Sequence, residues 1–115
     1  MSETFGAVVE QLSRIPGVRG AVIAEKDAGV AVVQELAEGV NGNALAALAA
    51  SLFRRTAHAG RASGFGAVSL VQLEAAGGHL LAVEAGELVL VVVAEQGAQL
   101  GLIRLEAARA GKSLA

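Results

Sequence analysis

The stretch Leu88-Val89-Leu90-Val91-Val92-Val93-Ala94 is an uninterrupted apolar run. It does not alternate between apolar and polar residues, as a strand with one solvated face does. A strand that is apolar on both sides lies in the middle of a sheet whose two faces are covered. We therefore expect a central strand at 88–94, with helices packed against each face of the sheet.

Four further strand-like runs accompany this one. The runs 67–74 and 79–84 precede it, and the turn sequences Ala76-Gly77-Gly78 and Ala85-Gly86 separate the three. The runs 18–25 and 30–36 flank Lys26-Asp27-Ala28-Gly29, where Asp and Gly tolerate the backbone angles of a turn. These runs predict a hairpin followed by a three-stranded meander.

Three segments have the spacing or composition of helices. The segment 3–15 places apolar residues at helical intervals and stops at Pro16-Gly17. The segment 43–59 is dominated by Ala and Leu, with Asn43 as a capping residue, and 99–110 is the third. The chain of 115 residues shows no internal repeat and no linker, so we expect one domain over 1–115.

The middle helix has two unusual faces. At about 100° per residue, its larger side chains gather on the face expected to cover the sheet, namely Leu45, Leu48, Ala49, Leu52, Phe53 and Thr56. The opposite face is expected to carry Ala46, Ala47, Ala50 and Ser51. That face is too small and too apolar for solvated surface, and a symmetry mate is the simplest source of a second packing surface. We expect a homodimer joined through these four residues.

Arg54, Arg55, His58 and Arg61 follow within eight positions of one another at the end of this helix. They can be a solvated helix end whose charges complement the helix dipole. They can also form a cationic patch, doubled by the dimer, that receives an acidic partner surface. An arginine finger that acts in trans on a nucleotide is a sharper version of the second interpretation.

The composition argues against several classes of function. The net charge of −2 and the 3% aromatic content give neither the field nor the stacking surfaces that nucleic-acid binding uses. The absence of cysteine excludes disulfides, thiolate metal sites and cysteine nucleophiles. No signal-peptide pattern opens the chain, and no apolar run approaches the ~20 residues that cross a bilayer. We expect a cytoplasmic protein without membrane insertion.

Motifs that would carry chemistry are incomplete. Gly111-Lys112-Ser113 resembles the end of a phosphate-binding loop but lacks the preceding glycine, and we expect a frayed tail there. Gly64-Phe65-Gly66 lacks the third glycine of a dinucleotide loop and is expected to be a linker. His58 and His79 lie on different elements without a second ligand at metal spacing. The sequence therefore predicts no metal, no cofactor and no enzymatic activity.

The order of elements resembles the roadblock/LC7 family, in its bacterial members. Ile15-Pro16-Gly17-Val18-Arg19-Gly20-Ala21-Val22-Ile23-Ala24 is similar to the family's first helix-to-strand junction, and Leu100-Gly101-Leu102-Ile103-Arg104 to the start of its last helix. The resemblance implies an α+β fold of order α-β-β-α-β-β-β-α, a three-layer α/β/α sandwich around a five-stranded antiparallel sheet. It also implies a homodimer joined through the middle helix, with neighbouring edge strands extending the sheet.

Members of this family are typically non-enzymatic regulators or scaffolds of small Ras-like GTPases. The resemblance thus implies a homodimeric adaptor that binds such a GTPase and modulates its nucleotide cycle. Arg54, Arg55, His58 and Arg61 are our candidates for the contact, because the family has no common catalytic residue to transfer. The alternatives are a structural scaffold in a larger assembly and a small-ligand sensor with an apolar pocket between sheet and helix.

Overall fold

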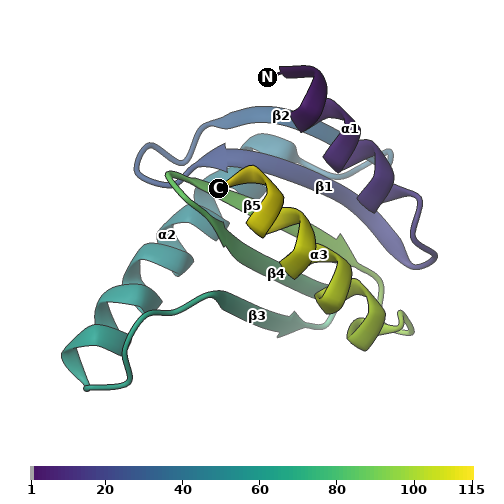
Figure 1. Cartoon of the computed structure of the whole chain (residues 1–115). Helices are drawn as coiled ribbons and strands as arrows, with labels where there is room; N and C mark the ends of the chain where they lie inside the picture. The colour runs from purple at the N-terminus through teal and green to yellow at the C-terminus, as the bar shows by residue number, and fades with distance from the viewer. Residues whose placement is uncertain (1) are drawn as a thin grey trace.

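The computed structural model describes residues 2–115, with side chains from residue 4 onward. Its helices and strands occur in the predicted order (Figure 1). They are α1 (Ser2–Ser13), β1 (Val18–Glu25), β2 (Ala31–Leu36), α2 (Gly42–Ala62), β3 (Leu70–Ala75), β4 (Gly78–Ala85), β5 (Leu88–Ala94) and α3 (Leu100–Leu114).

The five strands form one sheet in the order β2-β1-β5-β4-β3, and every neighbouring pair is antiparallel. The predicted central strand is confirmed, because β5 lies between β1 and β4. Val92 of β5 is opposite Leu81 of β4, and Val91 is opposite Val22 of β1. The hairpin and the meander expected from the turn sequences are also present. β2 and β3 are left as the two edges of the sheet.

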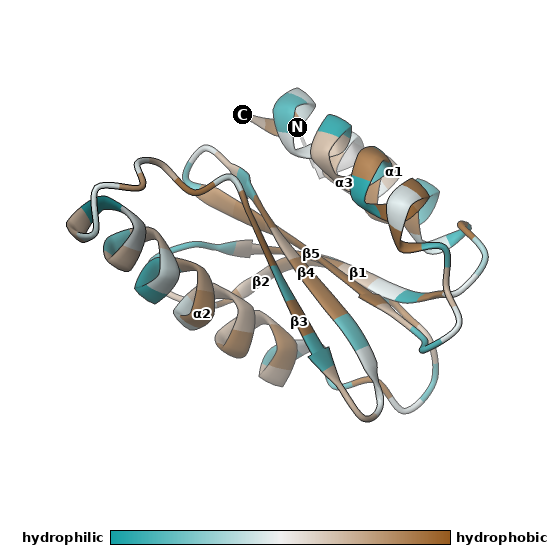
Figure 2. Cartoon of the chain, turned by 90° about the horizontal axis from the view of Figure 1, so that it is seen from below, coloured by the Kyte–Doolittle hydropathy of each residue, from teal (hydrophilic) through white to brown (hydrophobic). Residues whose placement is uncertain are grey.

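Helices cover both faces of the sheet, which makes the fold an α/β/α sandwich (Figure 2). Leu90 and Val92 point into the core shared with α1 and α3, while Val89 and Val91 point into the core under α2. All four side chains are fully buried. Burying a side chain of this size stabilises a fold by roughly 1.5–3 kcal/mol, so one strand anchors both hydrophobic cores.

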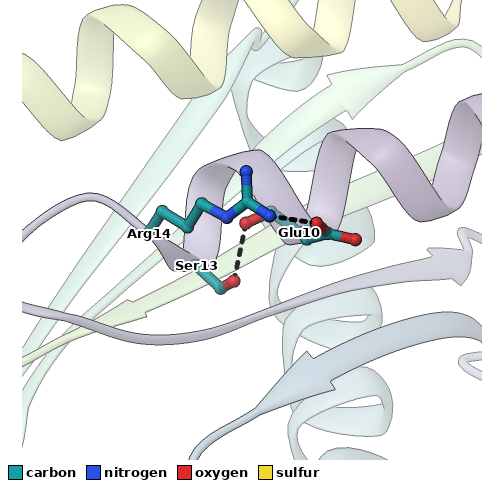
Figure 3. Close-up of polar contacts among 3 residues, drawn as sticks. All are labelled: Glu10, Ser13 and Arg14. Atoms are coloured by element: carbon teal, nitrogen blue, oxygen red, sulfur yellow. Dashed lines mark hydrogen bonds and ion pairs between the residues drawn. The ribbon is translucent and has the colours of Figure 1, made fainter.

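The end of α1 is fixed by local polar contacts (Figure 3). The Ser13 hydroxyl donates a hydrogen bond of 2.7 Å to the Glu10 carbonyl oxygen, and the Arg14 guanidinium pairs with the Glu10 carboxylate. Both partners of the ion pair are exposed, so it adds little stability. Gly17 then turns the chain with a φ of 91°, a backbone conformation that favours glycine.

Several boundaries differ from the sequence prediction, most clearly at the start of α2, the start of β3 and the end of α3. α2 is capped by Asn41, whose side-chain oxygen accepts a hydrogen bond of 3.1 Å from the backbone N–H of Ala44, and not by Asn43. Regular pairing of β3 begins at Leu70, three residues later than expected. α3 continues to Leu114, so the expectation of a frayed tail at 111–113 was wrong.

Candidate interaction surface

The inner face of α2 consists largely of small side chains. Ala46, Ala49 and Ala50 are 0% exposed and pack against the sheet beside Phe53. Our placement of Ala46 and Ala50 in a dimer contact was therefore wrong, because both belong to the core of a single chain. Ala46 lies two helical turns before Phe53, on the same side of the helix. Small residues at these positions let the α2 backbone lie close to the sheet.

The outer face of α2 is apolar over its first half. Ala47 is exposed and Ser51 is half-buried, so both point away from the core, and their role in a dimer contact stays a prediction. Leu48, which we expected to face the sheet, is 48% exposed. Ala44 also lies on this exposed side. This part of α2 therefore offers small and apolar side chains to solvent or to a partner.

An apolar groove adjoins this face, between the start of α2 and the end of β3. Its volume is about 190 Å³. Its lining residues come from α2, β3, β4 and β5, namely Leu45, Leu48, Leu73, Ala75, Gly77, Gly78, His79, Leu80 and Val93. Leu73 lies on the β3 edge and is itself exposed. The groove thus continues the apolar surface of α2 onto the free edge of the sheet.

The cationic residues gather on the second half of α2. Arg55, His58 and Arg61 are exposed, and no ion pair involves them within residues 4–115. The 21 residues of α2 include no acidic residue. An exposed helix surface with one sign of charge suits an acidic partner surface.

Arg54 differs from the other cations because it contacts its own chain. Its guanidinium Nη1 donates a hydrogen bond of 2.6 Å to the carbonyl oxygen of Lys26 in the β1–β2 turn. Lys26 in turn pairs with Glu84 at 3.0 Å, and its ammonium lies 5.4 Å from the ring centre of Phe53. Arg54 therefore ties the turn to α2, which leaves Arg55, His58 and Arg61 as the more accessible candidates.

The described part of the chain offers no assembled metal site. No group of three or more His, Cys, Asp or Glu side chains that could hold a metal ion occurs among those residues. His58 is exposed on α2, whereas His79 is buried on β4 and its Nδ1 has no hydrogen-bond partner among residues 4–115. Across residues 2–115, none of the helices combines the length and the apolar character needed to cross a bilayer.

Phe65 is the candidate residue that sequence reasoning missed. It is 93% exposed in the loop between α2 and β3, although it is one of only three phenylalanines in the chain. The flanking Gly64 and Gly66 both have positive φ, at 80° and 98°. The sequence signal was the Gly-Phe-Gly triplet, which we interpreted only as a failed dinucleotide motif and a linker.

Residues 4–94 match the family model of the Roadblock/LC7 domain, which is most of the chain. This chain belongs to the Roadblock/LC7 family. Among the similar proteins is an uncharacterized protein of Methanocaldococcus jannaschii, which is 29% identical over 107 residues. The match covers 93% of this chain and 93% of that relative.

Solved Roadblock/LC7 structures have the same architecture. The Roadblock/LC7 domain from Streptomyces avermitilis superposes with a TM-score of 0.84 at 27% identity, over 94% of this chain and 92% of that one. An MglB structure with a tetrameric arrangement also reaches a TM-score of 0.84, at 26% identity over 99% of this chain and 86% of that one. The family and the fold expected from the sequence are therefore confirmed.

Proposed function

We propose that this protein is a homodimeric, non-catalytic adaptor that binds a small Ras-like GTPase in the cytoplasm and modulates its nucleotide cycle. The observation that supports this most directly is the division of the outer face of α2. Its first half is apolar and suits self-association, whereas its second half carries Arg55, His58 and Arg61 without acidic neighbours on the helix. Membership of the Roadblock/LC7 family supports the class of partner.

Such an adaptor would act through differential affinity. A protein that binds one nucleotide state of a GTPase more tightly than the other shifts the equilibrium between the two states by that difference. The GTPase would supply the catalytic groups, and this chain would hold its switch loops. In the sharper version of the cationic-patch interpretation, this chain would itself add one catalytic group, because Arg55 or Arg61 would reach the phosphates as an arginine finger.

The test is affinity capture from the native lysate, performed in parallel with a GTP analogue and with GDP. We expect one small GTPase to be retained preferentially in one nucleotide state. Its direct binding is then measured with purified proteins by calorimetry. The variant with Arg55→Glu and Arg61→Glu should lose most of this binding, because like charges would oppose the acidic partner.

The matched control is Arg109→Glu. Arg109 is an exposed arginine on α3, which covers the other face of the sheet (Figure 2). This variant should bind as the wild type does. If the purified GTPase binds the variant with Arg55→Glu and Arg61→Glu as tightly as it binds the wild type, the cationic end of α2 is solvated surface. If no GTPase is retained in either state, the regulator proposal fails.

The scaffold alternative is supported by one comparison, since a similar MglB structure has a tetrameric arrangement. A scaffold would retain the same assembly with GTP analogue and with GDP, so the capture experiment separates the two functions. We do not propose the ligand sensor. Ala46, Ala49 and Ala50 fill the space between α2 and the sheet, and the groove beside them, of about 190 Å³, is smaller than the ~300–1,000 Å³ of usual ligand pockets. Two larger hollows beside α3, of about 440 and 420 Å³, are lined in part by charged side chains and are not the apolar pocket that a sensor of this kind would need.

A further inference from the structure

Two complementary apolar features lie at opposite ends of α2. The groove at the start of the helix is open, and its lining is apolar apart from His79. The loop after the helix carries Phe65, which is almost completely exposed. Exposed aromatic side chains are enriched as anchors at the centres of protein interfaces, where they fill apolar pockets. Phe65 thus has the character of an anchor for an apolar pocket on another molecule.

Backbone hydrogen bonds hold the loop that carries Phe65 against the end of α2. The backbone N–H groups of Phe65 and Gly66 both donate hydrogen bonds to the Gly60 carbonyl oxygen, at 2.8 and 3.1 Å. Gly60 is buried, and a Cβ on it would lie 2.8 Å from Cγ2 of Val68, so the loop is packed closely against the helix end. Because the loop backbone is already ordered, the Phe65 side chain is the part of the loop that loses conformational freedom when it docks.

Phe65 cannot reach the groove of its own chain. Leu48, in the groove, and Ala62, the last residue of α2, are 14 positions apart, which corresponds to roughly 21 Å of helix, and Phe65 lies in the loop bonded to that far end. A second copy whose α2 packs beside the first, related by a two-fold axis perpendicular to the helix, would place the two helices antiparallel. That arrangement brings Phe65 of each copy to the groove of the other, so the symmetry forms the same contact twice in one dimer.

We propose that Phe65 of one protomer occupies the groove of its partner, reciprocally, in a two-fold symmetric dimer. The groove is large enough to receive one aromatic side chain. The inference rests on the self-association in the proposed function and adds the residue that fills each groove.

The free edge of β3 is compatible with the same axis. β3 pairs with β4 on one side only, and it runs from just after the Phe65 loop to Ala75 in the groove lining. If the β3 edges of two copies pair antiparallel, the beginning of one β3 lies beside the end of the other. The Phe65 loop of each copy then lies beside the groove of its partner. In Figure 1 the end of α2 and the loop after it project past the sheet on the β3 side.

The first test is the dimerisation constant of Phe65→Ala, measured by sedimentation equilibrium. We expect dimerisation to weaken about 10- to 100-fold, because each dimer loses two aromatic anchors. The variant should stay folded, since Phe65 has little contact with its own chain. Leu105→Ala is the control, because Leu105 is 49% exposed on α3 and lies on the other face of the sheet. Equal constants for Phe65→Ala and wild type would overturn the inference.

The second test uses the absence of cysteine in the chain. Phe65→Cys and Leu48→Cys chains are mixed and treated with a short bismaleimide reagent. We expect a crosslinked heterodimer from this pair and none when Leu105→Cys replaces Leu48→Cys. No crosslink between positions 65 and 48, in a sample that sediments as a dimer, would contradict the reciprocal contact.

The outcomes separate this inference from the proposed function. A 65–48 crosslink without any captured GTPase supports the reciprocal dimer and removes the regulator proposal. A GTPase that binds a dimer unaffected by Phe65→Ala supports the regulator and removes the reciprocal contact. A wild-type chain that remains monomeric at about 1 mM, the upper end of weak association, removes both self-association and this inference.

Discussion

Gly111 allows α3 to lie directly on β4. A Cβ at this position would be 2.7 Å from Cγ1 of Val83 and 2.8 Å from the carbonyl oxygen of Glu84. A backbone oxygen cannot move aside as the tip of a flexible side chain can, so α3 would have to shift. Gly101, in the first turn of the same helix, has nothing within 4 Å of the corresponding position.

We predict opposite effects of alanine at these two glycines. Gly111→Ala should lower the free energy of unfolding by about 1–3 kcal/mol, because overpacking outweighs the better helix propensity of alanine. Gly101→Ala should raise it by up to about 1 kcal/mol, because only the propensity changes. Urea unfolding of both variants measures the difference. If Gly111→Ala were as stabilising as Gly101→Ala, the close contact of α3 with β4 would be refuted.

The same residue shows why the end of α3 was missed in the sequence. Gly111-Lys112-Ser113 contains a glycine and two polar residues, which is the composition of a loose tail. Its helical structure depends on a strand 28 positions earlier, where Val83 and Glu84 lie against the glycine. The local composition of residues 111–113 does not indicate that a distant strand packs against them, so this contact is visible only in the folded chain.

At the scale of the elements, the central strands were predictable and the orientation of α2 was not. β5 is apolar on both faces, so its position in the sheet follows from its own composition, and its bounds match. The α2 helix has apolar residues all around its first half, so periodicity alone could not choose its buried face. Ala49 and Phe53 face the sheet as we expected, and Leu45 packs against the same core. Leu48 is exposed instead, and the close approach of α2 to the sheet also buries Ala46 and Ala50.

We predict that introducing a carboxylate lowers the free energy of unfolding much more on the buried face of α2 than on its exposed face. Ala50→Glu should destabilise the chain by at least about 3 kcal/mol, because it buries an unpaired carboxylate in the core. Ala47→Glu, on the exposed face, should change the free energy of unfolding by no more than about 0.5 kcal/mol. Thermal and urea unfolding measure both. A native stability for Ala50→Glu would mean that α2 is rotated from the orientation described above.

At the scale of the whole molecule, the interaction surface is assembled from distant parts of the chain. The cations of α2 were visible in the sequence because they are neighbours along one helix. The groove was not, because it needs α2, β3, β4 and β5 together. Phe65 was visible as a residue, but its exposure depends on how the loop is held against Gly60. Sequence reasoning therefore found the charges and missed the apolar parts.

The distribution of charge distinguishes self-association from partner binding. The chain has nine Lys and Arg and eleven Asp and Glu, yet α2 carries three arginines and no acidic residue. The midpoint between Leu48 and Phe65 lies near Thr56. An antiparallel dimer with the reciprocal Phe65 contact therefore brings the Arg55 side chains of both copies close to the two-fold axis. Like charges that approach in this way oppose the apolar contacts.

We therefore predict that salt tightens the dimer and weakens the binding of an acidic partner. Raising the ionic strength from about 0.01 M to 1 M shortens the Debye length from about 30 Å to 3 Å, which screens repulsion and attraction alike. Sedimentation equilibrium and calorimetry measure the two constants. Because salt also strengthens apolar association, the control is the variant with Arg55→Gln and Arg61→Gln, whose dimerisation should depend less on salt than that of the wild type. An equal or opposite salt dependence would place the arginines away from the two-fold axis.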